Sequence, residues 1–323
     1  MPISRVFARA PRGRTPLCRW LPLAGICLLG SLLSVQAQAR TLVTGFGDVE
    51  VDGEPSRVVT LYEGALDAAL AAGVTPLGGV ATRGGQDVAR YLQASVPDIQ
   101  IVGLAGEVNV EAVVGLAPDL ILASPSLSDA TYALLSQLAP TVVPTTEGLA
   151  PEAWKQEALL FGEALGRRDR VAEAIGAVET RAESIRATAR QTRGDRVHLV
   201  RWMPQGPLVM STQLFSTGLL SAAGLEVTDV GMVPGGRPHS DPLSLEALSQ
   251  IDGDWLFLAT LNDDGEQALA AAEQTPAFRR LSVVEDDRVV AVDGQLWTSA
   301  NGPLAAQAVL DDIEAALASD SAP

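Results

Sequence analysis

The chain predicts an α/β fold with two pseudo-symmetric lobes, mostly parallel sheets and a single long bridging helix. Two stretches 135 positions apart, 109–122 and 244–257, share one pattern: a helix N-cap residue, a Glu in the first turn, a short apolar helix and a strand after Asp. Before each of them, 70–74 and 221–225 are typical of a helix that ends at a Gly. Repetition of this kind predicts two lobes of one design with a ligand cleft between them.

In the first lobe, strand-like runs alternate with helical ones, which is typical of mostly parallel sheets. A turn at Asp52-Gly53 opens this lobe. We expect its strands at 58–61, 77–80, 99–102, 120–123 and 141–143, with helices between them.

The second lobe shows the same alternation and closes on a helix. Its predicted strands are 197–202, 208–210, 255–258 and 289–292. The last helix is expected over 303–318, where Pro303 suits the first turn.

The segment between the lobes is the unusual part of the pattern. After a helix at 152–165, residues 168–191 place apolar side chains three and four positions apart, on one narrow face of a helix about 36 Å long. An ordinary surface helix of the second lobe is the alternative, but this length is enough to bridge the lobes. A continuous helix would limit the lobes to small rocking motions. The apolar positions are Val171, Ile175, Val178, Ala182, Ile185 and Ala189.

The first 39 residues are typical of an export signal. An arginine-rich start precedes an apolar run at 20–35 and the small-residue cleavage pattern Ala37-Gln38-Ala39. A transmembrane anchor would need about 20 apolar residues, and a lipid anchor at Cys27 is opposed by the large Ile26 before it. The expected organisation is therefore a cleaved signal peptide over 1–39, an N-terminal lobe over 40–165, a bridging helix over 166–192 and a C-terminal lobe over 193–323.

Composition narrows the classes of partner. Both cysteines, Cys18 and Cys27, lie in the leader, so the mature chain of 284 residues would depend on its core alone. Loss of the five leader arginines takes the formal charge from −16 to −21, which opposes nucleic acid and anionic membrane as partners. Apart from Lys155, every basic residue is Arg, whose planar fork suits carboxylate or catecholate oxygens.

Enzyme and metal signatures are absent from the sequence. There is no Gly-x-Ser-x-Gly, no phosphate-binding loop with Lys and no His-Glu-x-x-His, and the acidic pairs 263–264 and 286–287 stand in solvated turns. Of the two histidines, His198 alternates with apolar residues in a strand and His239 stands in a loop. We therefore expect neither catalysis nor a resident metal or cofactor.

Four segments resemble the helix-backbone periplasmic binding proteins of ABC importers, and the likeness covers the mature chain in order. They are DGEPSRVVTL at 52–61, the helix that begins NVE at 109 and ends PDLI at 118–121, VRW at 200–202 and GQLWTSANGPLAA at 294–306. The resemblance is strongest to the iron-siderophore branch. It implies a periplasmic monomer that carries a ferric siderophore to an ABC permease in the inner membrane. Haem or cobalamin is the alternative ligand. The alternative function, outside this family, is that of an exported hydrolase.

The family's site implies ligand contacts at the ends of strands in both lobes. Arg201 beside Trp202 needs an anion or an aromatic face, whereas Trp202 and Phe215 could be core aromatics and Trp297 could pin the last helix. His239 could instead be an axial haem ligand with Tyr62 opposite. The candidate ligand-binding residues are Tyr62, Arg83, Arg201, Trp202, Phe215, Arg237, His239 and Trp297, with Ser124 at a further strand end.

One departure from the family narrows the ligand. The ferric hydroxamate-binding relatives carry an Arg where this chain has Ala105. Arginines elsewhere around the cleft favour an anionic chelate such as a ferric catecholate or carboxylate.

The resemblance also gives a role to the repeated glutamates. Glu111 and Glu246 each occupy the second position of a helix, where the helix dipole favours a carboxylate. They match the family's paired glutamates that dock onto the two permease subunits.

Overall fold

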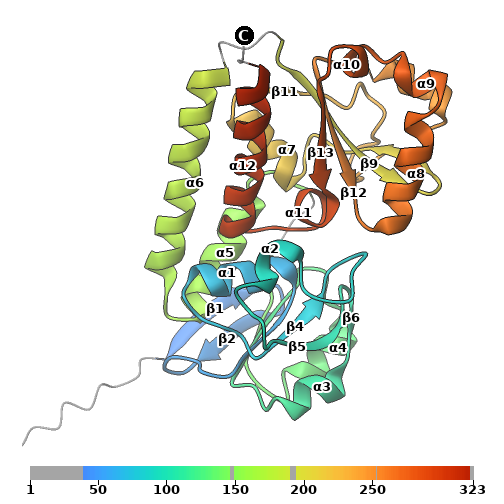
Figure 1. Ribbon diagram of the computed structural model, residues 1–323. Coiled ribbons are helices and arrows are strands. Elements are labelled where there is room, and N and C mark those ends of the chain that lie inside the picture. The colour runs from blue at the N-terminus through green and yellow to red at the C-terminus, as the bar shows by residue number, and fades with distance from the viewer. Residues whose placement is uncertain (1–38, 146–148, 190–193, 252, 321–323) are drawn as a thin grey trace, which may run out of the picture. The chain divides into compact units, whose positions relative to one another are not determined.

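The computed structural model describes residues 39–145, 149–189, 194–251 and 253–320 and contains the two sheet-based lobes that the sequence predicts (Figure 1). The predicted export signal, apart from its last residue, lies outside these ranges.

The sheet of the N-terminal lobe has the strand order β6-β5-β4-β3-β7-β8. β6 pairs antiparallel with β5, and the other neighbours are parallel. β3 and β7 have the predicted bounds, and β4, β5 and β8 overlap their predicted ranges. The strands are β3 (Val58–Leu61), β4 (Gly78–Ala81), β5 (Gln100–Leu104), β6 (Glu107–Val108), β7 (Leu120–Ala123) and β8 (Thr141–Val142).

A hairpin that was not predicted from the sequence precedes this sheet. β1 (Arg40–Thr44) and β2 (Gly47–Val51) pair antiparallel, and Leu42, Val49 and Val51 turn inward into the core. Each strand has only two or three inward positions, so the alternation is too short to stand out.

The helices of this lobe start and stop on the local signals that predict them. Asn109 accepts a 3.1 Å hydrogen bond from the Ala112 N–H at the start of α3, and Gly73 with φ of 76° follows the end of α1. The helices are α1 (Glu63–Ala71), α2 (Arg90–Gln93), α3 (Val110–Gly115), α4 (Asp129–Leu135) and α5 (Ala153–Ala164).

In the C-terminal lobe the strand order is β10-β9-β12-β13, and β11 pairs with β9. β10 is antiparallel to β9, and the remaining pairs are parallel. β11 was not predicted, since two residues leave no readable pattern. The strands are β9 (Arg196–Met203), β10 (Gly206–Val209), β11 (Glu226–Val227), β12 (Trp255–Thr260) and β13 (Val289–Asp293).

Helices cover both faces of this second sheet, with α7 and α12 on one side and α8 on the other (Figure 1). The repeat of α3 is a 3-10 helix, η1, which Ser244 caps through the Ala247 N–H. The helices are α7 (Phe215–Ala222), η1 (Leu245–Gln250), α8 (Asp263–Glu273), α9 (Pro276–Arg279), α10 (Ser282–Glu285), α11 (Gly294–Thr298) and α12 (Pro303–Asp320).

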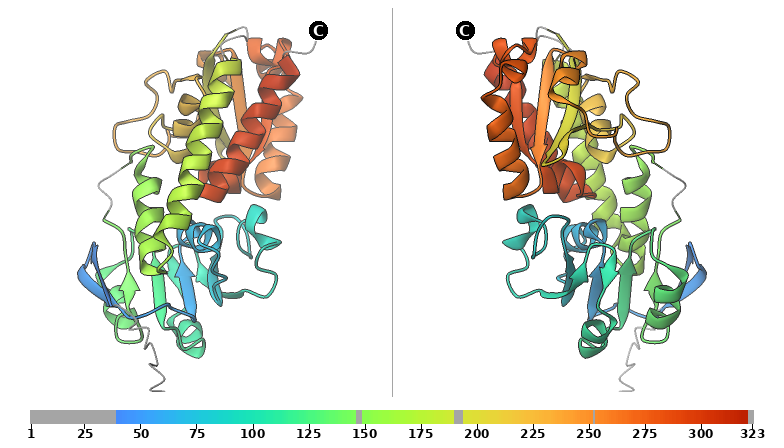
Figure 2. Two further views of the ribbon diagram at one scale, coloured as in Figure 1. Left: turned by 90° about the vertical axis from the view of Figure 1, so that its left-hand side faces the viewer. Right: turned by 90° about the vertical axis from the view of Figure 1, so that its right-hand side faces the viewer.

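The predicted bridging helix is α6 (Arg168–Ala189), and it packs against helices of both lobes. Its contacts include α1 and α5 on one side and α7 and α12 on the other, and the pair α6 and α12 is visible in both views of Figure 2. All six apolar positions that predict the helix are buried. A shared core therefore joins the lobes along this side.

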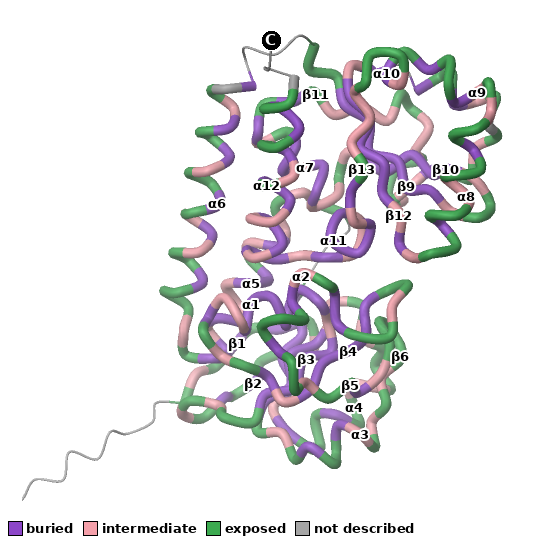
Figure 3. The backbone as a smooth tube through the Cα atoms, viewed as in Figure 1, coloured by how far each residue is buried: buried purple, intermediate pink, exposed green. Residues whose placement is uncertain are grey.

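Figure 3 shows which parts of the chain are buried. Purple segments concentrate in the strands and on the inner faces of α1, α6 and α12, while loop tips are exposed. Within the described ranges, no helix combines the length and apolar character needed to cross a membrane.

Candidate functional site

A cavity of about 320 Å³ is lined by residues of both lobes. In the N-terminal lobe it lies at the carboxyl ends of β3, β4, β5 and β7, where α/β sheets commonly hold ligands. The C-terminal lobe contributes residues of β9, of the segments that follow β10 and β11, and of the end of α11. The lining residues are Leu61, Tyr62, Glu63, Arg83, Ala105, Gly106, Ser124, Ser126, Arg201, Met210, Leu214, Pro238, His239, Thr298 and Ser299.

The guanidinium of Arg201 is the most unusual group in this lining. Arg201 is 6% exposed, and its Nε has no hydrogen-bond partner in the described part of the chain. Burial, with a smaller effect of the nearby Arg83 charge, lowers its pKa. Within the described residues no carboxylate forms a salt bridge with either arginine, so an anionic ligand would stabilise the two positive charges at this end of the cavity.

Glu63, which was not among the predicted site residues, adds an acid to the same cavity. It is 7% exposed and accepts a hydrogen bond from the Thr82 hydroxyl. Burial raises the pKa of Glu63 to about 7, although the Thr82 and Arg83 hydrogen bonds and the Arg83 charge act in the opposite direction. Its position directly after Tyr62, at the end of β3, was the available signal.

Tyr62 joins the two lobes through a polar triangle. Its hydroxyl donates to Glu157 Oε2 at 3.2 Å and accepts from Asn301 Nδ2 at 2.7 Å. Asn301 also donates to Glu157 Oε2 at 3.4 Å. Burial raises the pKa of Tyr62, so its hydroxyl stays protonated at neutral pH.

His239 lies in the lining beside β10, where it forms an isolated bridge with Met210. Its Nδ1 is 2.7 Å from the carbonyl oxygen of Ser240. A carbonyl only accepts, so Nδ1 carries the proton.

The expectation that Trp202 contacts ligand does not match its position. Arg201 and Trp202 are neighbours on β9, and successive residues of a strand point to opposite faces. Arg201 lines the cavity, so Trp202 points to the opposite face of the sheet, into the hydrophobic core between this sheet and α8. There it is 2% exposed and makes an edge-to-face contact with Phe278.

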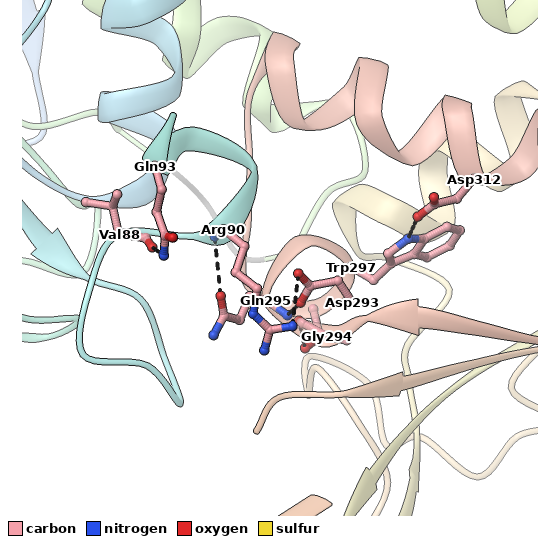
Figure 4. A network of polar contacts seen from close by, with 9 residues as sticks. Val88, Arg90, Gln93, Asp293, Gly294, Gln295, Trp297 and Asp312 are labelled. Atoms are coloured by element: carbon pink, nitrogen blue, oxygen red, sulfur yellow. Dashed lines mark hydrogen bonds and ion pairs between the residues drawn. The ribbon is translucent and has the colours of Figure 1, made fainter. Parts of the chain in front are cut away.

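Trp297 is also absent from the cavity lining. It is 1% exposed, stacks on Phe257 with ring centroids 4.9 Å apart and donates from Nε1 to Asp312 Oδ2 at 2.7 Å (Figure 4). These contacts hold α11 against α12, in agreement with the alternative role of pinning the last helix.

A second link between the lobes lies at α2 (Figure 4). The Arg90 guanidinium is 3.5 Å from Asp293, and the Arg90 N–H donates to Gln295 Oε1 at 3.4 Å. Both side chains of the ion pair are partly exposed, so it contributes little to the stability of the protein.

The other two predicted contacts are absent from the lining of the 320 Å³ cavity, which Arg83 and Arg201 make the arginine-lined cavity. Arg237 forms a 2.8 Å salt bridge with Asp241 and is not in the lining. Phe215, at the start of α7, lines a second cavity of about 260 Å³ and contacts Trp154 edge to face. Of the eight predicted ligand contacts, the arginine-lined cavity therefore brings together four: Tyr62, Arg83, Arg201 and His239.

Ala105 lies in the lining, so no guanidinium reaches the cavity from that position. Glu111 and Glu246 are exposed at the second positions of α3 and η1. Within the described ranges, no three His, Cys, Asp or Glu side chains group closely enough to hold a metal ion.

Comparison with known proteins identifies related chains over most of this length. A family model described as periplasmic binding protein matches residues 58–296. The probable siderophore-binding lipoprotein YfiY of Bacillus subtilis (strain 168) is 28% identical, over 86% of this chain and 87% of its own. The Fe(3+) dicitrate-binding periplasmic protein FecB of Escherichia coli (strain K12) is 26% identical, over 88% of this chain and 92% of its own.

Solved structures share the fold. Staphylococcus aureus SirA complexed with staphyloferrin B matches with a TM-score of 0.73 at 23% identity, over 86% of this chain and 98% of SirA. A periplasmic solute binding protein from Mycobacterium smegmatis str. MC2 155 matches with a TM-score of 0.72 at 26% identity, over 87% of this chain and 98% of that chain.

Proposed function

This chain belongs to the periplasmic binding protein family, and we propose that it captures a ferric siderophore in the arginine-lined cavity and delivers it to an ABC permease in the inner membrane. The observation that carries the proposal is Arg201, a buried guanidinium without a carboxylate partner in the described part of the chain. Such a group favours an anionic ligand strongly, because burial removes the water that would otherwise stabilise its charge.

The proposed ligand contacts are Tyr62, Arg83, Arg201 and His239, which share the cavity. The relatives named for siderophore and ferric dicitrate binding support a ferric chelate over haem or cobalamin. The cavity has two arginines, and position 105 is Ala and not Arg. Both features favour a carboxylate or catecholate chelate over a hydroxamate.

The haem alternative requires Tyr62 and His239 as axial ligands. The Tyr62 hydroxyl is already engaged with Glu157 and Asn301, and burial raises its pKa, which opposes the phenolate that would bind iron. These contacts count against that arrangement.

Docking to the permease is proposed for Glu111 and Glu246. Each is an exposed carboxylate at the second position of a capped helix, one in each lobe. Charged rim contacts of this type act mainly in recognition and orientation. We further propose export through cleavage of the leader 1–39 and action as a monomer.

A ligand panel tests the proposal. The chain from residue 40 onward would be titrated calorimetrically with ferric citrate, a ferric catecholate, a ferric hydroxamate, haem and cobalamin. The proposal expects the citrate or catecholate complex to bind most tightly. Preferential binding of haem or cobalamin, or no binding of any ferric chelate, would overturn it.

A further inference from the structure

The second cavity shares part of its wall with the arginine-lined cavity. Its volume is about 260 Å³, and Tyr62, Ser124, Ser126 and Leu214 line both. The two cavities are therefore adjacent. The two spaces differ in charge, because the first has two arginines beside Glu63, whereas the second has Glu157 in its lining and no arginine.

The polar end of the second cavity offers hydrogen-bond acceptors. Glu157 is 7% exposed, and its Oε2 accepts from Tyr62 and Asn301. The two Asn301 hydrogen bonds use its Nδ2, and Asn301 Oδ1 is a buried atom without a hydrogen-bond partner in the described part of the chain. A buried acceptor without a partner is uncommon in a folded protein and is a natural position for a ligand donor.

Three aromatic side chains, Tyr62, Trp154 and Phe215, also line the second cavity, beside aliphatic and small polar residues. Trp154 and Phe215 meet edge to face with centroids 5.7 Å apart, and Tyr62 forms the boundary with the first cavity. Aromatic faces attract an ammonium group electrostatically and pack against the methylene groups that carry it. A carboxylate, an amide oxygen and three rings thus form a set of contacts suited to a primary amine.

We propose that the second cavity is a subsite for an amine-bearing arm of the siderophore, with Glu157 and Asn301 Oδ1 accepting hydrogen bonds from its ammonium group. The inference rests on the proposed function and names the class of chelate: an anionic iron-binding head for Arg83 and Arg201, joined to a positively charged arm. Compact chelates such as ferric citrate occupy the first cavity alone.

Matched synthetic ligands test the subsite on the unmodified protein. The probes are ferric complexes of citrate monoamides that end in an amine (2-aminoethyl and 4-aminobutyl) and of amides of equal length that end in a methyl group (propyl and pentyl). Calorimetry should give a Kd about tenfold lower or better for an amine-ended probe than for its methyl-ended partner, because its hydrogen bonds are charge-assisted. Equal Kd values at both lengths, with ferric citrate bound, would overturn the subsite and leave the proposed function standing. Failure of every ferric chelate to bind would overturn the proposed function.

Variants identify the groups responsible. Glu157→Gln should bring the amine-to-methyl affinity ratio towards one, and Asn301→Leu should reduce it. The matched control is Glu152→Gln, which removes an exposed carboxylate at the start of the same helix, outside the cavity. An unchanged ratio in both cavity variants, with melting temperatures that establish folding, would contradict the assignment. If one variant does not fold, the other variant and the unmodified protein still decide it.

Discussion

Asp67 on α1 accepts a 2.7 Å hydrogen bond to Oδ2 from the backbone N–H of Ala305 at the start of α12. Its Oδ1 accepts a second bond, 2.9 Å long, from the Leu304 N–H. A carboxylate of the N-terminal lobe thus caps a helix of the C-terminal lobe. Gly302 makes room for it, since a Cβ there would lie 2.4 Å from Asp67 Oδ1, and its φ of 124° favours glycine.

Replacing Asp67 with Ala should destabilise the protein. The side chain is fully buried, and its loss leaves two backbone N–H groups and the Tyr91 hydroxyl without their acceptor. Each orphaned donor costs roughly 1 to 3 kcal/mol. Denaturant unfolding measures the loss, and Asp98→Ala, at an exposed position, is the control. A change no larger than that of the control would refute the cross-lobe cap.

The affinity for an anionic chelate should fall as pH rises from about 6 to about 8. Glu63 has a pKa of about 7, so below that pH it is neutral and above it a negative charge joins Arg83 and Arg201 in the cavity. We expect the affinity to decrease about tenfold, which is the scale of one partly screened interaction between two charges. Titration of Glu63→Gln with the same chelate corrects for the chelate's own protonation and should give a flatter profile. An equal slope in the variant would exclude Glu63 as the source.

Arg201→Ala should weaken binding of an anionic ferric chelate by about 1 to 3 kcal/mol, the scale of a lost charge-assisted contact. Arg237→Ala is the comparison, because Arg237 is paired with Asp241 and lies outside the cavity lining. Calorimetric titration of both variants separates a local effect from a change in overall charge. Equal losses would remove the special role of Arg201.

Ligand binding should produce only a small compaction, since α6 is continuous and its apolar face is buried against both lobes. X-ray scattering with and without ferric chelate measures the radius of gyration. A decrease of several ångströms, as in hinge-closing proteins, would contradict a restraining helix.

The double variant Glu111→Ala, Glu246→Ala should keep chelate affinity and melting temperature near those of the parent but lose iron uptake. Both side chains are exposed and stand outside the cavity lining. Uptake of radioactive ferric chelate would be measured in cells of the organism that encodes this protein, after its gene has been replaced by the variant gene. The pair Glu173→Ala, Glu183→Ala removes two exposed charges from α6 and should transport normally. Full transport by the first variant would leave its glutamates as helix-terminal residues.

Local patterns carry most of the fold. The apolar spacing from Val171 to Ala189 predicts α6 and its buried face, and Asn109 and Ser244 start the helices that they cap. These signals depend on a residue and its near neighbours, so they are readable from the chain. Strands with two or three inward residues, such as β1 and β2, lack that redundancy.

The site depended on tertiary structure to a greater degree. Strand alternation could have separated Arg201 from Trp202, but only packing decides which of the two faces the cavity. Tyr62 and Asn301 lie 239 positions apart and meet through a hydrogen bond. Local sequence describes the chemical groups that each strand end presents, whereas the cavity consists of distances between strand ends, which arise only when both lobes pack around α6.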